Sequence, residues 1–147
     1  MTATPQPFLI SWNITKRCNL KCAHCYLDAS ELAGNAELSY DGARKVVDEI
    51  ASLNPQSMLI LTGGEPLMRE DCLPLAKYAS GKGITVVIGT NGMLLNDDIA
   101  GRMVESGVKG AGISLDSRSP GFHDGFRGVQ GAWEKTDSGI DALRKHG

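Results

Sequence analysis

Three cysteines lie close together near the N-terminus, at a spacing that can bind iron and sulfur. Cys18, Cys22 and Cys25 follow the pattern C-x3-C-x2-C. An iron–sulfur cube usually takes four cysteine thiolates, so three thiolates leave one iron with an open coordination position. A chelating ligand from outside the chain can occupy that position. The motif therefore predicts a cluster that binds a further molecule, with these three cysteines as its ligands.

A zinc site is the alternative interpretation of the same residues. Structural zinc takes four ligands, so His24 or a distant residue would have to be the fourth. His24 fits poorly, because it immediately precedes Cys25 and both side chains would have to turn to one ion from adjacent positions. The remaining cysteine, Cys72, stands alone in a predicted helix, where a small buried hydrophobe is expected. The cysteine spacing favours the cluster and leaves zinc open.

Two polar segments follow apolar runs further along the chain. In Thr62-Gly63-Gly64-Glu65-Pro66, the glycines allow backbone to approach a ligand closely, and the carboxylate can accept hydrogen bonds from an ammonium group. The next segment places Thr90 and Asn91 before a glycine. Each segment could also be only a turn, since Gly-Gly and Asn-Gly pairs favour turns and Glu65 could be solvated.

A third polar segment, Ile113-Ser114-Leu115-Asp116, ends the fourth apolar run. If the strand continues through it, period-two alternation turns Ser114 and Asp116 to the same side, which should face a pocket. Downstream, Arg127 offers a planar guanidinium fork that suits a carboxylate. An isolated arginine would more simply be a surface residue.

Four short runs rich in Val, Ile, Leu or Met alternate with amphipathic stretches, which predicts four βα units. The expected strands are Phe8–Thr15, Met58–Gly63, Ile84–Thr90 and Gly110–Asp116. Continuous hydrophobicity in the middle runs is typical of a parallel sheet covered on both faces. Since parallel α/β sheets place ligands at the carboxyl ends of their strands, the polar segments should meet in one site.

Helical patterns fill the gaps between the predicted strands. Ser39 can cap a first helix, a second spans about Asp71–Ser80, a third lies between Asn96 and Gly107, and a last one lies between Trp133 and His146. The segment 16–38, before the first helix, is far longer than the ~2–6 residues of an ordinary βα loop. Its length favours a functional loop.

Composition narrows the class of protein. With 41% hydrophobic and 22% charged residues, the chain is typical of a globular domain. The net charge is -2 and no block of like charge occurs, which favours neither nucleic acid nor a membrane surface as a partner. Residues 1–7 lack a signal-peptide pattern. We expect a cytoplasmic protein, because a reducing compartment suits three neighbouring thiols.

The cysteine motif after a first strand resembles the signature of the radical SAM superfamily, and residues 62–66 resemble that family's GGEP motif. The resemblance implies that Cys18, Cys22 and Cys25 hold a 4Fe-4S cluster, whose open iron is chelated by S-adenosylmethionine (AdoMet). It implies AdoMet contacts for a further set of residues: His24 at the adenine; Gly63, Gly64 and Glu65 at the amino group; Thr90 and Asn91 in the pocket; Ser114 and Asp116 at the ribose hydroxyls or the methionine carboxylate; and Arg127 at that carboxylate.

The same resemblance implies a fold and a reaction. Members of the family build a partial TIM-type barrel from six βα units, of which four are recognisable here, so we expect residues 1–147 to be a core domain truncated at its C-terminal end. The implied reaction is reductive cleavage of AdoMet to a 5′-deoxyadenosyl radical that abstracts hydrogen from the substrate. An electron donor such as flavodoxin or ferredoxin is the implied partner.

Two segments narrow the resemblance further. Residues 17–26 and 123–133 are similar to maturases with a C-terminal cysteine-rich (SPASM-type) extension. This favours a small-molecule substrate, a tetrapyrrole in alternative-haem biosynthesis. A maturase of peptides or of peptide-derived quinone cofactors is the alternative, and a non-catalytic zinc-binding module is the hypothesis from a different class. Four strands cannot close a six-unit barrel, so we also expect this chain to associate through its open edges.

Overall fold

The computed structural model of the chain describes residues 6–29 and 37–147. The expectations for the N-terminal end and for the middle of the long loop fall partly on residues 1–5 and 30–36, outside the described residues. In chain order the elements are β1 (Leu9–Thr15), α1 (Tyr40–Leu53), β2 (Met58–Gly63), the short 3-10 helix η1 (Pro66–Met68), α2 (Cys72–Gly81), β3 (Thr85–Thr90), α3 (Asp97–Glu105), β4 (Val108–Ile113), α4 (Pro120–Arg127) and α5 (Ala132–His146).

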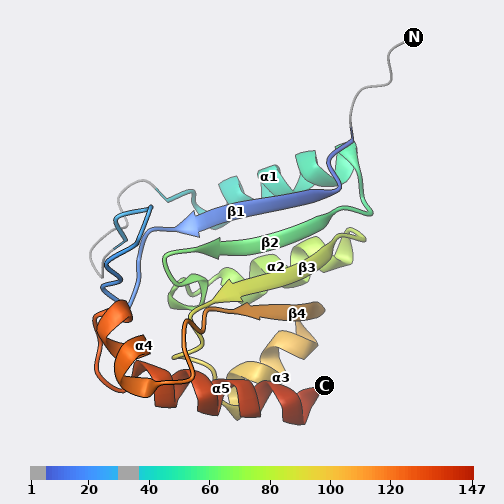
Figure 1. Cartoon of the computed structure of the whole chain (residues 1–147). Coiled ribbons are helices and arrows are strands. Elements are labelled where there is room, and N and C mark those ends of the chain that lie inside the picture. The colour runs from blue at the N-terminus through green and yellow to red at the C-terminus, as the bar shows by residue number, and fades with distance from the viewer. Residues whose placement is uncertain (1–5, 30–36) are drawn as a thin grey trace.

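The four strands form one parallel sheet in the order β1-β2-β3-β4 (Figure 1). This confirms the predicted α/β class and its βα units. The prediction that the fourth strand runs from Gly110 to Asp116 is wrong at both ends, since β4 begins at Val108 and ends at Ile113. Its partner β3 ends at Thr90, which pairs with Ile113, so no neighbouring strand extends β4 further. Ser114 and Asp116 therefore lie in a loop, and the period-two argument does not apply to them.

Helix caps predicted from the sequence are present. The Ser39 hydroxyl accepts a hydrogen bond from the Gly42 N–H at the start of α1, and the Asn96 side chain accepts one from the Ile99 N–H at the start of α3. These bonds satisfy donors that have no partner within the helix. Helix α4 was not predicted, because it is short and contains two glycines, which have low helix propensity.

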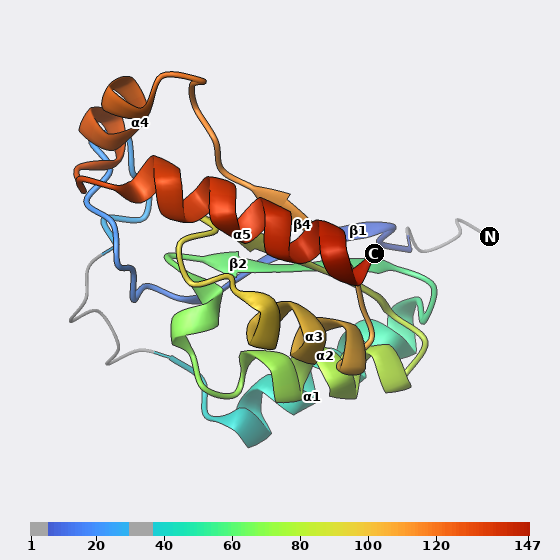
Figure 2. The same cartoon turned by 90° about the horizontal axis from the view of Figure 1, so that it is seen from below.

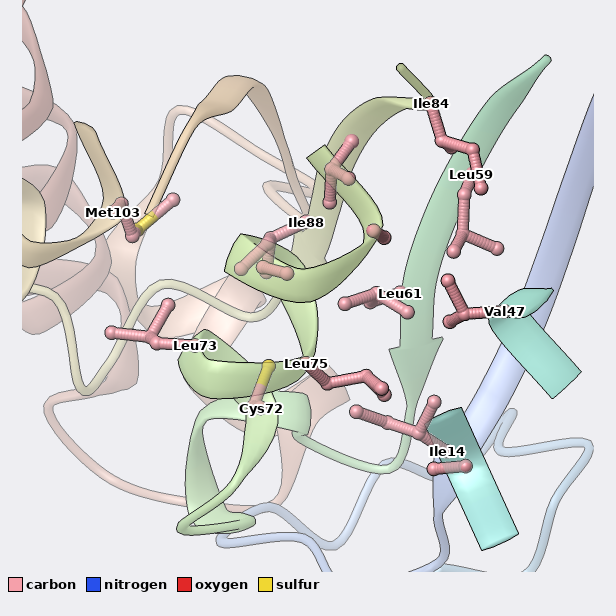
Figure 3. Packing of buried hydrophobic residues seen from close by; sticks show 14 of the residues in the cluster. Ile14, Val47, Leu59, Leu61, Cys72, Leu73, Leu75, Ile84, Ile88 and Met103 are labelled. Atoms are coloured by element: carbon pink, nitrogen blue, oxygen red, sulfur yellow. The ribbon is translucent and has the colours of Figure 1, made fainter. Parts of the chain in front are cut away.

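Helices α1, α2 and α3 cover one face of the sheet (Figures 1 and 2). Leu59, Leu61 and Ile88 point into this layer and are fully buried, as are Val47 of α1 and Leu75 of α2 (Figure 3). Burying a side chain of this size contributes about 1.5–3 kcal/mol. This core fixes the strands whose carboxyl ends carry the polar segments.

Cys72 lies in the same core and is 1% exposed, which confirms its predicted burial. Burial raises the pKa of its thiol to about 12. A protonated, enclosed thiol is neither a nucleophile nor a metal ligand. Cys72 is therefore a packing residue.

The opposite face of the sheet is only half-buried, so the expectation of cover on both faces is wrong here. Ile60 and Val87 on that face are partly exposed, whereas Leu61 and Val86 beside them are completely buried. Helix α5 packs against α3 and α4, and in Figure 1 the uncovered face is turned to the viewer. None of the described helices is both long and apolar enough to cross a membrane.

Candidate functional site

A cavity of about 260 Å³ opens at the carboxyl ends of the strands, between the cysteine loop and the end of α4. All of the predicted site residues line it except Glu65 and Asp116. Those that do are Cys18, Cys22, His24, Cys25, Gly63, Gly64, Thr90, Asn91, Ser114 and Arg127. The structure thus brings residues from distant segments to one site, as the sequence predicts, and their roles toward a cofactor stay predictions.

The cysteine loop is fastened to α4 through its backbone. The Lys21 N–H donates to the Arg127 carbonyl at 3.0 Å, and the Ala23 N–H donates to the Phe126 carbonyl at 3.3 Å. Within this loop Cys18 is buried, Cys22 is partly exposed and Cys25 is exposed. The three thiols therefore run from the protein interior to the surface along the cavity wall.

A cluster and a single metal ion make different demands on the three thiols. Among the described residues, no three His, Cys, Asp or Glu side chains converge where they could hold one ion. A structural zinc ion needs four ligands at about 2.0–2.3 Å from one point. In an iron–sulfur cube each cysteine binds its own iron, so the sulfurs need not converge. Three free thiols are the donor set for three irons of a cube, so the residues present fit a cluster.

His24 lies at the cavity wall in a stack of aromatic rings. Its ring is 4.1 Å from that of Phe126, centroid to centroid, with 11° between the planes. The Phe126 ring in turn stacks with Phe122 at 6.0 Å. The stacking fixes the plane of the His24 ring, which is the property that a contact with a flat adenine would use.

Both glycines of the Gly63-Gly64 pair are required by a close backbone approach. Gly63 has φ 137°, and a Cβ on it would lie 2.3 Å from the Thr15 carbonyl oxygen. A Cβ on Gly64 would lie 2.2 Å from the Arg17 carbonyl oxygen. The Gly64 N–H donates to Thr15 and the Glu65 N–H donates to Arg17, at 2.8 and 2.7 Å. The pair therefore anchors the start of the cysteine loop while its backbone lines the cavity.

The Glu65 carboxylate is not among the groups that line the cavity, and its predicted contact with an ammonium group stays a prediction. It is completely buried and accepts hydrogen bonds from the Thr90 hydroxyl and from the Asn91 and Leu67 N–H groups. Burial raises the pKa of Glu65, and the hydrogen bonds from Asn91, Leu67 and Thr90 oppose that rise. Its side chain ties the end of β2 to the end of β3.

Asn91 continues this network to the cysteine loop. Its side-chain nitrogen donates to the Asn19 side-chain oxygen at 2.7 Å and lies 4.0 Å from the Cys18 sulfur. Its side-chain oxygen accepts from the Met93 N–H at 2.9 Å. With only 6% of its surface exposed, Asn91 is a buried connector between β3 and the first cysteine.

Arg127 is held by Asp116. The guanidinium Nε and Nη2 donate to the two Asp116 carboxylate oxygens at 2.6 and 2.7 Å, and Nη1 lies 3.7 Å from the Cys22 sulfur. Burial would raise the pKa of Asp116, but the hydrogen bonds and charge of Arg127 outweigh it and hold that pKa below its ordinary value. Asp116 is not among the residues that line the cavity, and its predicted contact with AdoMet stays a prediction.

Sequence reasoning missed Arg69, whose guanidinium joins both ends of the cysteine loop. It donates to the Ile14 carbonyl at 2.9 Å before the loop and to the Leu38 carbonyl at 2.8 Å after it. Asp71 binds the same guanidinium through both carboxylate oxygens, and Arg69 is 7% exposed. The only signal in the sequence is an arginine and an aspartate two residues apart, which is too common to identify such a role.

Known proteins resemble this chain over nearly its whole length. An AdoMet-dependent heme synthase from Methanosarcina barkeri is 42% identical over 142 residues, covering 97% of this chain and 40% of that protein. The mycofactocin maturase MftC from Mycobacterium ulcerans is 34% identical over 123 residues, covering 84% of this chain and 33% of that protein. The chain thus spans about two fifths or less of these relatives.

A solved structure, described as native anSMEcpe with bound AdoMet, shares the fold with a TM-score of 0.76 at 20% identity, over 94% of this chain and 40% of that one. This likeness confirms the predicted partial TIM-type barrel. The family profile that matches residues 12–147 is that of the Radical SAM superfamily. The chain belongs to that superfamily.

Proposed function

We propose that this chain holds the 4Fe-4S cluster and the AdoMet of a radical SAM enzyme. One observation carries the proposal: three closely spaced thiols and the polar ends of the strands line a single cavity. When bound, these two groups supply a 5′-deoxyadenosyl radical that abstracts hydrogen from a substrate. The chain's own residues bind and orient the groups and keep water away from them.

The residues at the cavity suggest a division of roles. Cys18, Cys22 and Cys25 would hold three irons, and the backbone of Gly63 and Gly64 can approach the amino group of AdoMet closely. Further contacts with AdoMet are proposed for the other predicted site residues that line the cavity, which are His24, Thr90, Asn91, Ser114 and Arg127. Glu65 would act behind this wall, by fixing the ends of β2 and β3.

The proposed substrate is a tetrapyrrole, in the maturation of an alternative haem. The support is the higher identity to the heme synthase, 42% over 97% of this chain, than to the mycofactocin maturase, 34% over 84%. Because the mycofactocin maturase is also similar, a peptide or peptide-derived cofactor stays the alternative substrate. A product analysis with both substrate classes, on a chain extended to the length of the relatives, distinguishes the two.

An electron donor such as flavodoxin or ferredoxin is the proposed partner. Cys25 is exposed, which places one edge of a bound cluster near solvent. Lys16, Arg17 and Lys21 are exposed in the same loop, and such a group of cations favours a negatively charged donor. We propose a cytoplasmic location, because a reducing compartment keeps the thiols available.

Anaerobic reconstitution with iron and sulfide tests the proposal. We expect about four irons per chain and the broad visible absorbance of a cluster, whereas a zinc site is colourless. Changing Cys18, Cys22 or Cys25 singly to alanine should abolish the cluster. Cys72→Ala is the matched control, because that thiol is buried in the core, and its iron content should equal that of the parent. Full iron content in any of the first three variants would contradict the ligand assignment.

A further inference from the structure

A chain of polar contacts leads from a buried histidine to one of the proposed cluster ligands. His123 Nδ1 lies 3.2 Å from the Asp116 carboxylate, Asp116 binds the Arg127 guanidinium, and that guanidinium lies 3.7 Å from the Cys22 sulfur. We propose that these linked contacts set the reduction potential of a cluster bound at Cys22. Arg127 acts on the cluster, and Asp116 and His123 are positioning residues for Arg127. The inference rests on the proposed function.

The guanidinium has little freedom to turn away from the sulfur. Asp116 occupies its Nε and Nη2 in a bidentate pair, and a planar fork held along one edge fixes the direction of the remaining nitrogen, Nη1. The backbone carbonyl of Arg127 also accepts a hydrogen bond from the Lys21 N–H, next to Cys22. Both ends of the Arg127 residue are therefore fixed relative to the cysteine loop.

The carboxylate of Asp116 is itself oriented from behind. His123, which is 1% exposed, has Nδ1 within 3.2 Å of an Asp116 carboxylate oxygen and 3.3 Å from the Asp116 backbone nitrogen. The buried ring thus holds the backbone of Asp116, whose N–H donates to Nδ1, and lies against the Asp116 carboxylate.

The charged side chains of Arg127 and Asp116 are partly shielded from water, so their effect on a nearby cluster is screened less than that of fully exposed charges. The side chains of Arg127 and Asp116 are 11% and 19% exposed. Reduction adds a negative charge to a cluster, and a cation that donates to a ligand sulfur favours the reduced state and raises the potential. The Asp116 carboxylate has the opposite charge and limits this effect. The two residues should therefore shift the potential in opposite directions.

An EPR-monitored redox titration of the reconstituted protein, without AdoMet, tests the inference. Arg127→Met removes the cation and should lower the midpoint potential. Asp116→Asn keeps one oxygen that can accept from the guanidinium but removes the balancing charge, so it should raise the potential. Arg127→Lys keeps the charge without the fork, and its potential should lie between those of the parent and Arg127→Met. Arg118→Met is the matched control, since Arg118 is an exposed arginine of the same segment, and it should leave the potential unchanged.

Iron content, measured on every variant, separates this test from the test of the proposed function. A parent that binds no four-iron cluster would overturn the proposed function itself. With a cluster present, equal potentials in parent, Arg127→Met and Asp116→Asn would overturn the inference, and so would shifts of the same sign in both variants. If Arg127→Met does not hold a cluster, the potential of Asp116→Asn alone tests the inference. Asparagine keeps the shape of the side chain, so this variant should still fold and bind the cluster, and a potential that does not rise would overturn the inference.

Discussion

The hydroxyl of Thr90 lies 2.8 and 2.9 Å from the two carboxylate oxygens of Glu65, behind the wall of the cavity. The two residues are 25 positions apart in the sequence and come from the ends of neighbouring strands. Backbone N–H groups of Leu67 and Asn91 donate to the same carboxylate, one to each oxygen. A motif that resembles a ligand-binding signature therefore holds the scaffold together here.

Glu65→Gln should destabilise the protein, although it changes the shape of the side chain very little. Each carboxylate oxygen accepts from a backbone N–H, so an amide –NH2 in either place would face a donor and leave it unsatisfied. We expect the free energy of unfolding, measured by urea denaturation, to fall by about 1–3 kcal/mol. Glu105→Gln, on the exposed surface of α3, is the control and should change little. Equal stability of Glu65→Gln and the parent would show that the carboxylate is not the acceptor that the structure describes.

Stability should depend on pH through Asp124, a buried residue of α4 whose carboxylate lies against the start of α5. Its carboxylate accepts hydrogen bonds from the Trp133 and Gly131 N–H groups, and these bonds lower the pKa of Asp124 in the folded state. A lowered folded-state pKa gives stability that is present above the unfolded-state pKa and lost as the pH falls through the folded-state value. Asp124→Asn should therefore be less stable than the parent at pH 7.

Urea denaturation of both proteins from pH 7 down to about pH 3, below the ordinary pKa of an aspartate, checks this dependence. The difference in unfolding free energy should shrink as the pH falls, because the parent loses the contribution and the variant has none to lose. Asp141→Asn, which changes an exposed aspartate of α5, serves as the control. A difference that stays constant over the range would assign the effect of Asp124→Asn to packing.

The parts of the fold that were predicted correctly depend on local pattern. The ends of β2 follow from an apolar run bounded by glycine, and the caps of α1 and α3 follow from Ser39 and Asn96 at the starts of periodic segments. The position of the cavity follows from the rule that parallel strands end at the same edge of a sheet. These features need no knowledge of distant contacts.

The parts that were missed depend on contacts between distant segments. The end of β4 is set by the end of β3 at Thr90, which no pattern within β4 reveals. The direction of the Glu65 carboxylate depends on donors at Thr90 and Asn91. Arg69 acts through two carbonyls from either side of the loop, 55 and 31 positions away. A single sequence carries no local signal for such pairs.

Arg69→Met should loosen the cysteine loop. The change leaves the Ile14 and Leu38 carbonyls and the Asp71 carboxylate without this donor. The bond to Ile14 is buried, and a buried group left unsatisfied costs about 1–3 kcal/mol. We expect a lower free energy of unfolding, faster proteolysis within residues 16–38, and less iron per chain after reconstitution. Arg69→Lys should restore part of each property, because a lysine can still reach some of the acceptors.

Arg102→Met is the control for that series, since Arg102 is an arginine of similar length that is half exposed and pairs with Asp98 on the surface of α3. Such surface pairs contribute about 0–1 kcal/mol. In Arg102→Met, residues 16–38 should be cleaved by protease as slowly as in the parent. Unchanged proteolysis and iron content in Arg69→Met would show that the loop keeps its shape without this guanidinium.

The outer strands β1 and β4 each have an unpaired edge, so we expect the 147-residue chain, made alone, to associate with itself. Within the described sheet, β1 pairs only with β2 and β4 pairs only with β3, so each has an edge of unpaired backbone groups. Beside these edges Phe8 and Leu9 are 75% and 53% exposed, and Gly112 of β4 has open space where a side chain would be. Unpaired edges of this kind are templates for pairing with another chain.

Size-exclusion chromatography with light scattering should show species larger than a monomer that increase with concentration. Gly112→Lys should reduce them by placing a charge on the β4 edge, and a chain extended by two more βα units should reduce them further. A parent that stays monomeric at every concentration would show that the described strands need no partner.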